Sequence, residues 1–288
     1  RLFILLLLCT AALIAQPLDR GRTGSALEFR QPDGVQRVVS RSAGLKVDTS
    51  SRRSVARFYA NHYVPYNKVP NAWTGSTGSC TVGRNSAAYD NATLQNLNFY
   101  RALAGVPADV TFDERFNKPA RAAALIMEAK NDLSHGPPPA WPCFSESGKA
   151  GAGSSNLCLG CVGPGAIDAY IQDSGIQGVG HRGWALHPRQ KVMGTGSSKR
   201  ANALYVFGDW RSEAEVKHIK QTLWPAAGYM PYRFGYDSAY PWSYQHHGKA
   251  RHDRARVSMK INGRSVRVRT ETNRHILVWY PVGLPRAT

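Results

Sequence analysis

The chain has 288 residues, 42% of them hydrophobic, and carries 37 Lys and Arg against 19 Asp and Glu, a net charge of +18. This apolar fraction is enough for a globular core, which excludes a chain that stays unfolded for lack of hydrophobic residues. So basic a surface attracts nucleic acid, anionic lipid head groups and acidic wall polymers. A soluble protein with a solvated basic face has the same composition, so charge alone names no partner.

The N-terminal stretch, RLFILLLLCTAALIAQP, places an arginine before an apolar run that ends at Ala15. The pattern predicts a secretory signal peptide over residues 1–16, because the run is too short to span a bilayer comfortably. Cys9 opens a lipoprotein alternative, although Leu8 is a poor residue before a lipidated cysteine. No later run has membrane length, so we expect a secreted or extracytoplasmic protein without a transmembrane segment.

Cys80, Cys143, Cys158 and Cys161 remain after the leader. In an oxidising compartment four thiols favour two disulfides, for which three connectivities exist. We expect Cys80–Cys143, which ties an N-terminal linker to a later loop, and the local pair Cys158–Cys161; crossed pairings stay open. Zinc or redox chemistry at the C-x-x-C is the alternative, but no second C-x-x-C accompanies it.

Residues 17–85 are rich in Arg, Ser, Gly and Asn and predict a linker with one short helix, in SVARFYANHYV. A stronger helical pattern follows, capped by Asn91 or Thr93 and ended by Gly105. Its apolar face consists of Leu94, Leu97, Tyr100 and Ala104.

A second long helix is predicted with Asn117 as its cap, Pro119 in its first turn and an end at His135, before GPPP. Its small-residue face, suited to close packing, consists of Ala120, Ala123, Ala124 and Met127. Residues 136–165 predict a loop rich in Gly, Pro, Ser and Cys.

PGAIDAYIQD predicts a short helix with Ile167, Tyr170 and Ile171 inward. GVGHRGWALHP predicts a loop with one helical turn, and KVMGTG and ANALYVFGDW predict two strands. Helices around a small sheet indicate an α+β layered domain.

The C-terminal part, residues 212–288, predicts a small all-β domain. Asn262-Gly263 predicts a type I′ hairpin turn, with Met259 opposite Val266 and Val257 opposite Val268. The outer face of this hairpin carries Arg256, Lys260, Arg267 and Arg269. HILVWYPV predicts a third strand. The charged face either keeps an edge hairpin from aggregating or docks on an acidic surface.

The candidate site residues are His135, His181, His187 and Asp173. Neither His135 nor His181 belongs to a local metal motif such as H-E-x-x-H, and each taken alone is typical of a structural histidine. The pair His246-His247 lies in a polar, basic stretch that predicts surface positions.

The order of these segments over residues 86–211 resembles the CAP superfamily, which includes cysteine-rich secretory proteins, venom antigens, pathogenesis-related proteins and bacterial exported members of SCP type. NLNFYRALAGVPADVTFDERF resembles the family's opening helix, with Arg101, Gly105 and Asp113 in register, and GHRGWALHPRQKVMGTG is similar to its G-H-Y-T-Q segment. The resemblance implies a CAP-like α-β-α sandwich, followed here by the β domain.

The family's cavity tetrad of His, Glu, His and Glu is implied at His135, Ser155, Asp173 and His181, with Asn156 also lining the cleft. Serine replaces one glutamate and aspartate the other, which makes a poorer site for zinc or copper. His135 and His181 are the implied metal ligands. Ser155 as a nucleophile would need a nearby base and an oxyanion hole, and no G-x-S-x-G is present.

The resemblance implies a secreted, non-catalytic binding module, expected as a monomer, whose ligand is a lipid, cell-wall material or another anionic surface. The alternative is a metal-dependent hydrolase that uses His135, Asp173 and His181, with zinc as the cofactor. Specific nucleic-acid binding has only the charge in its favour.

Overall fold

The computed structural model describes residues 10–11, 27–28, 44–231, 234, 239–248, 252, 254–272 and 275–284. The predicted signal peptide therefore lies outside the described residues, apart from a two-residue strand, and so does most of the N-terminal half of the predicted linker. None of the described helices combines the length and the apolar character needed to cross a membrane.

The α-helices are α1 (Arg52–His62), α2 (Ala87–Leu103), α3 (Glu114–Lys130), α4 (Glu146–Gly153), α5 (Gly163–Gln172), α6 (Gly180–Ala185) and α7 (Glu213–Val216). Two short 3₁₀ helices are η1 (Tyr66–Lys68) and η2 (Gln177–Val179). The first strands are β1 (Thr10–Ala11), β2 (Leu27–Glu28), β3 (Thr111–Phe112), β4 (Ser155–Leu159), β5 (Gln190–Ser197) and β6 (Ala201–Trp210). The later strands are β7 (Gln221–Trp224), β8 (Tyr229–Met230), β9 (Trp242–His246), β10 (Met259–Ile261), β11 (Arg264–Val266), β12 (Val268–Thr272) and β13 (Ile276–Pro281).

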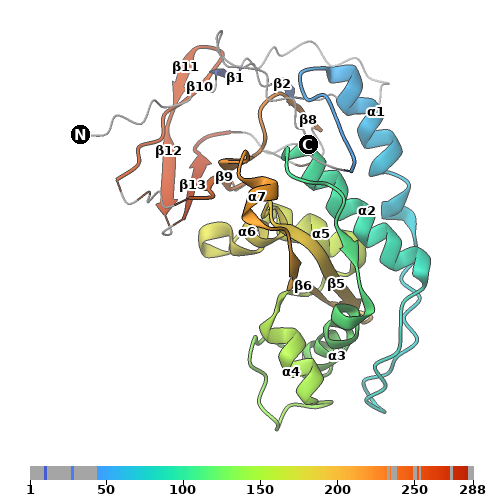
Figure 1. Ribbon diagram of the computed structural model, residues 1–288. Helices are drawn as coiled ribbons and strands as arrows, with labels where there is room; N and C mark the ends of the chain where they lie inside the picture. Colours follow the sequence, from blue (N-terminus) through green and yellow to red (C-terminus); the bar gives the residue numbers. More distant parts are fainter. Residues whose placement is uncertain are drawn as a thin grey trace.

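The fold is mixed α+β, with helices packed against a four-stranded sheet of order β3-β5-β6-β4. β3 runs parallel to β5, and the other neighbours are antiparallel. Alternate residues of β6 point into two different clusters. Leu204 and Val206 join a cluster with α2 and α5, whereas Ala203 and Tyr205 join one with α3 and α4. Helices therefore cover both faces of the sheet (Figure 1).

Two helix starts differ from the prediction. α2 begins at Ala87, where the Ser86 hydroxyl accepts the Tyr89 N–H, so neither Asn91 nor Thr93 is the cap. α3 begins at Glu114 with Asp113 as its cap, which places Pro119 inside the helix instead of in its first turn. The side chain of Asn117 accepts the Thr195 N–H of β5, so this expected cap instead joins the helix to the sheet.

The region predicted as a loop, residues 136–165, contains α4 and β4. α3 ends at Lys130, where Asn131 adopts a left-handed conformation at φ 56°, so His135 lies beyond the helix and not at its end. α4 packs closely on α3, because a Cβ on Gly151 would lie 2.1 Å from the Pro119 carbonyl oxygen. Two glycines of the predicted loop, Gly148 and Gly151, thus serve helix packing.

The C-terminal part is an antiparallel β region. Its main sheet has the order β12-β13-β9-β7, and β13 is the third strand predicted from HILVWYPV. Trp224, Tyr240 and Trp242 belong to the same buried cluster as α2 and α5. The β region and the helical layer therefore share one core.

The hairpin prediction is confirmed at its turn and wrong beyond it. Met259 pairs with Val266, and Asn262 and Gly263 have φ of 50° and 76°, as a type I′ turn requires. After Val266 the chain enters the other sheet, where Val268 pairs with Pro281 and Arg269 with Tyr280. Arg256 and Arg269 are therefore not opposed across the hairpin. Arg269 stacks instead on the Tyr280 ring, 4.0 Å from its centroid.

Both predicted disulfides, Cys80–Cys143 and Cys158–Cys161, are present. The first joins the segment before α2 to the loop before α4. The second lies where β4 leads into α5.

Candidate functional site

The centre of the candidate site is a pair formed by Asp173 and His181. Asp173 ends α5 in a left-handed conformation at φ 50°, and Gly178, at φ 74°, turns the chain into α6. This short path returns His181 to the carboxylate. In the GVG stretch before His181, Gly178 and Val179 have φ of 74° and 44°, so a glycine supplies the conformational freedom at the first of these two left-handed positions.

The Asp173 carboxylate holds the His181 ring in one orientation. It accepts the Nδ1–H of His181 at 2.8 Å with one oxygen and the backbone N–H of Arg182 at 3.1 Å with the other. Asp173 is 2% exposed, while the side chain of His181 keeps 21% of its surface. Because Nδ1 carries the proton toward the carboxylate, Nε2 is left as the proton acceptor.

Tyr170 and Asn156 support this pair. The Tyr170 ring lies 5.3 Å from the His181 ring, and its hydroxyl donates to the Asn156 carbonyl at 3.0 Å. The Asn156 side chain in turn donates to the His181 carbonyl at 2.9 Å. Burial, with a smaller contribution from Asp173, raises the pKa of Tyr170 well above its usual value, so the hydroxyl stays a donor.

The other two residues of the expected tetrad are engaged elsewhere. His135 Nδ1 donates to the Ala152 carbonyl at 2.9 Å, and the Ser155 hydroxyl donates to the Gly151 carbonyl at 2.7 Å. Among the described residues, His135 has no hydrogen bond, ion pair or ring contact with Asp173 or His181. The structure thus joins Asp173, His181 and Asn156, while Ser155 and His135 both bind the end of α4.

The donor set does not fit a resident metal ion. Within the part of the chain that the structure describes, no three His, Cys, Asp or Glu side chains are grouped so as to hold one. Zinc sites in proteins use three or four such ligands. Among the described residues, His135 and His181 are therefore not part of such a group of ligands.

Three aromatic rings, one of them three residues after His181 in the chain, form a partly exposed patch. Trp184 is 36% exposed and Phe207 45%, and their ring centroids lie 4.8 Å apart. Trp210 completes the patch, 5.9 Å from Trp184 and stacked parallel to Phe207 at 6.5 Å. The Arg189 guanidinium covers Trp210 at 5.4 Å. We call Trp184, Phe207 and Trp210 the aromatic platform.

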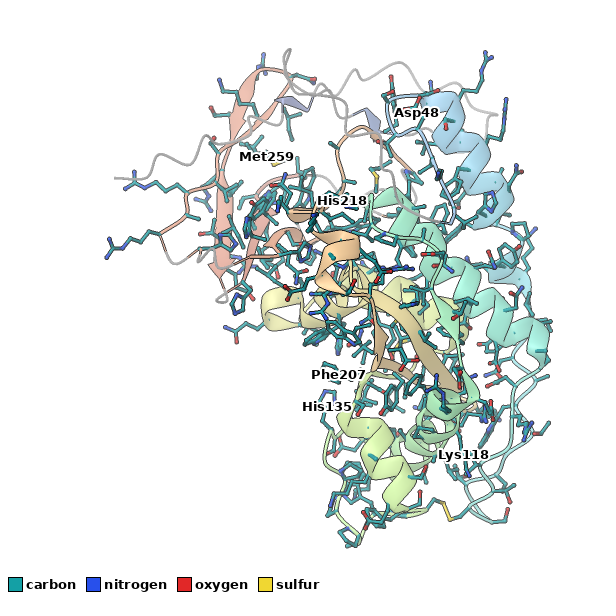
Figure 2. The ribbon with its side chains drawn as sticks, viewed as in Figure 1. Asp48, Lys118, His135, Phe207, His218 and Met259 are labelled. Carbon is teal, nitrogen blue, oxygen red and sulfur yellow. A yellow bond between two sulfur atoms is a disulfide. The ribbon has the colours of Figure 1, made fainter. Side chains whose placement is uncertain are left out.

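An irregularity in the sheet puts Phe207 at the surface. Val192 pairs with Asp209, but Gly194 pairs with Tyr205, so β6 contains extra residues between these two points. Bulges of this kind re-aim side chains beside binding sites. Figure 2 shows Phe207 on the same side of the drawing as His135, with His135 nearer to α4. The sequence carries no signal for this bulge, which exposes Phe207 beside Trp184.

His187 and His247 form a second imidazole pair, at the border of the platform. Their rings lie 5.3 Å apart, and His247 Nε2 shares a hydrogen bond of 2.7 Å with the Thr222 hydroxyl. Burial, then the charges of His247, Arg101 and Arg189, lowers the pKa of His187 to about 3. Burial, then His246, lowers the pKa of His247 to about 4. His246 and His247, which we expected at the surface, are both partly buried and partly exposed.

Comparison of the chain with protein-family models, with curated proteins and with solved structures finds no match. Function must therefore be argued from the residues of the site.

Proposed function

We propose that the protein is an extracytoplasmic binding module of CAP type, with a CAP-like α-β-α sandwich, that holds a glycan of the cell envelope on the aromatic platform. The layer of helices on both faces of the sheet and the two disulfides support the class. The aromatic platform is the reason for proposing a glycan as the ligand, and it is the single observation that carries the proposal.

Contact between exposed aromatic rings and water is unfavourable, so covering the rings with a partner is favourable. Contiguous apolar patches therefore mark interaction sites. Trp184 and Phe207 face solvent at an angle of 73° to each other, so they form the two walls of a corner. The apolar faces of sugar rings stack on such side chains, whose aromatic area is large and rigid. Arg189 and Lys191, together with the net charge of +18, favour glycans that carry acidic groups.

The test uses the full chain and an insoluble acidic cell-wall polysaccharide. Co-sedimentation and intrinsic tryptophan fluorescence report binding. We expect the double variant Trp184→Ala/Phe207→Ala to bind at least ten-fold more weakly, which corresponds to about 1.4 kcal/mol. Val282→Ala is the matched control, because Val282 is also exposed, at 37%, and lies outside the platform. Equal binding by the double variant and the control contradicts the proposal. If the protein binds lipid vesicles and not the polysaccharide, the ligand is a lipid and the glycan proposal is wrong.

One observation favours a second candidate, a hydrolase in which His181 is the general base. A buried carboxylate that orients an imidazole and leaves Nε2 free to take a proton supplies two of the three members of a catalytic triad. Ser155 is not the nucleophile of this arrangement, since its hydroxyl is bound to Gly151, so water would attack. The hydrolase proposal predicts hydrolysis of a chromogenic acetate ester that falls at least 100-fold in His181→Gln and resists EDTA. Equal rates in the wild type and in His181→Gln would contradict the hydrolase proposal and leave binding as the only proposed function.

A further inference from the structure

A pocket of about 530 Å³ lies away from the aromatic platform, between the start of α3, the start of α4 and the residues before α2. Pockets of this size hold small molecules. Its lining consists of Val82, Gly83, Arg84, Glu114, Lys118, Arg121, Ala122, Ser145 and Ser147. In Figure 2, Lys118 marks this place beside α3.

The lining is positively charged, with three cations against one anion. Arg121 is 7% exposed and binds Glu114 through both guanidinium nitrogens, one of them at 3.2 Å. The hydrogen bonds from Arg121 are the main cause that lowers the pKa of Glu114, with a smaller contribution from the charge of Arg84, so Glu114 keeps its charge and is paired with Arg121. Within the described residues, the side chains of Arg84 and Lys118 have neither a hydrogen bond nor an ion pair. Two positive charges are therefore left for a ligand.

Two serines at the start of α4 line the same pocket. Ser145 caps α4 by accepting the Gly148 N–H at 3.1 Å, and Ser147 lines the pocket two residues further along the chain. The first N–H groups of a helix have no partner within the helix and favour anions. They add to the two cations, which are the principal feature of the pocket.

The walls are fixed in place before any ligand binds. The segment that carries Arg84 folds back on itself. The Thr74 N–H donates a hydrogen bond to the Arg84 carbonyl at 3.0 Å, and the Trp73 indole N–H donates one to the Val82 carbonyl at 2.8 Å. Gly83 has φ 62°, and a Cβ there would lie 2.2 Å from the Gly75 nitrogen. The Cys80–Cys143 disulfide joins this wall to the chain that enters α4.

We infer that this pocket binds the phosphate group of a small phosphomonoester. Guanidinium groups match phosphate oxygens in pairs, and a lysine adds a compact charge. The volume exceeds that of a phosphate alone, which leaves room for the organic group of the ester. The pocket lies on the α3–α4 side of the sheet and does not depend on the function proposed for the platform.

The test titrates the full chain with glucose 1-phosphate, with inorganic phosphate as a competitor and glucose as the neutral probe. Calorimetry gives the affinity, and the amide signals of Glu146 and Ser147 give the location. We expect Arg84→Gln/Lys118→Gln to raise the Kd at least ten-fold. Lys199→Gln/Arg200→Gln, which removes the same charge from the exposed turn between β5 and β6, should change it less than two-fold.

Three results would overturn the inference. The first is an equal loss of affinity for glucose 1-phosphate in both double variants, which would show that net charge and not the pocket determines binding. The second is binding of glucose as strong as that of glucose 1-phosphate. The third is the absence of any phosphomonoester binding, including the case in which only a phosphodiester polymer binds.

Discussion

The two faces of the central sheet are packed by opposite means. On the α3–α4 face the backbones themselves come together, and a Cβ on Gly196 would lie 2.2 Å from the Arg121 backbone nitrogen. On the α2–α5 face large rings fill the space, and Phe99 stacks on Phe58 at 5.1 Å and meets Tyr63 at 5.2 Å. The first face has no room for one more methyl group, whereas the second is built from side chains that can move.

The two proposed sites lie in different surroundings. The phosphate pocket lies on the rigid face, where the α3–α4 contact and a disulfide fix the positions of the cations. The aromatic platform lies where the sheet has a bulge and the rings are partly exposed. Rigid elements suit a ligand with fixed geometry, while exposed rings suit repeating ligands that can slide.

The largest effect is expected from Gly196→Ala. The new methyl group meets backbone atoms of α3, which no rotamer change can move away, so the free energy of unfolding should fall by about 3 kcal/mol. Gly165→Ala is the control, because nothing lies within 4 Å of a Cβ there and alanine favours helix α5. Urea titrations of both variants give the values. A loss below about 1 kcal/mol for Gly196→Ala would mean that the α3–α4 face adapts to a substitution as readily as the α2–α5 face.

The next effect depends on pH and acts where the β region meets α6. The pKa values of His187 and His247 are lowered to about 3 and about 4 from 6.5. At pH values between the lowered pKa values and 6.5, the two histidines bind more protons in the unfolded chain than in the folded one. The free energy of unfolding therefore decreases as the pH falls below 6.5. We expect a loss on the order of 2 kcal/mol between pH 7 and 4.5, after allowance for partial exposure.

The matched variant is His247→Gln, measured by thermal unfolding at pH 7 and 4.5. It should remove part of this loss and leave the rest to His187, whereas His62→Gln, on α1, should leave the pH profile unchanged. Identical pH profiles for wild type and His247→Gln would exclude the pair as the source.

The sequence predicts those parts of the fold that local chemistry determines. Periodicity locates α5 and strands β5 and β6, and Asn262-Gly263 specifies its turn, because only residues that tolerate positive φ fit there. Ser86, with Asp90 in the first turn, is a local signal for the true start of α2, but Asn91 and Thr93 compete with it as caps.

The parts that could not be predicted depend on contacts between distant segments. Arg269 was assigned to the hairpin because its alternation continues through Val268, but its strand pairs with β13. Phe207 alternates as a buried strand residue, and only the mismatch in length between β5 and β6 exposes it. Asp173 and His181 could be paired by resemblance, whereas the phosphate pocket joins residues near 84, 118 and 145, which share no motif.

A smaller effect is expected in the aromatic face, from Phe99→Leu. Phe99 is fully buried, at 0% exposure, so the variant loses apolar contact, but neighbouring rings can shift into part of the space. The free energy of unfolding should fall by about 1 to 2 kcal/mol, clearly less than for Gly196→Ala, in the same urea titrations. A larger loss than that of Gly196→Ala would reverse the comparison between the two faces.

The smallest effect on stability is expected for residues that belong to neither face. Arg256, Arg264 and Arg267 are exposed, and their side chains have no hydrogen bond or ion pair within the described part of the chain. Changing all three to serine should alter the free energy of unfolding by less than about 0.5 kcal/mol per residue. Six of the residues from 254 to 272 are basic and one is acidic, so the same variant should weaken binding to phosphatidylglycerol vesicles at low salt. A ten-fold loss that shrinks as salt rises is expected, because screening removes the attraction.

The control for this last prediction is the α1 variant Arg52→Ser/Arg53→Ser/Arg57→Ser, which removes the same three charges from another exposed surface. If the β10–β11 region docks on anionic surfaces, the control keeps most of the binding. If both variants lose binding equally, the net charge of +18 acts as a whole, and the arginines of the hairpin only protect an edge from aggregation. Sedimentation of vesicles at two salt concentrations separates these outcomes, since a local site and a diffuse charge both respond to salt but only the local site depends on position.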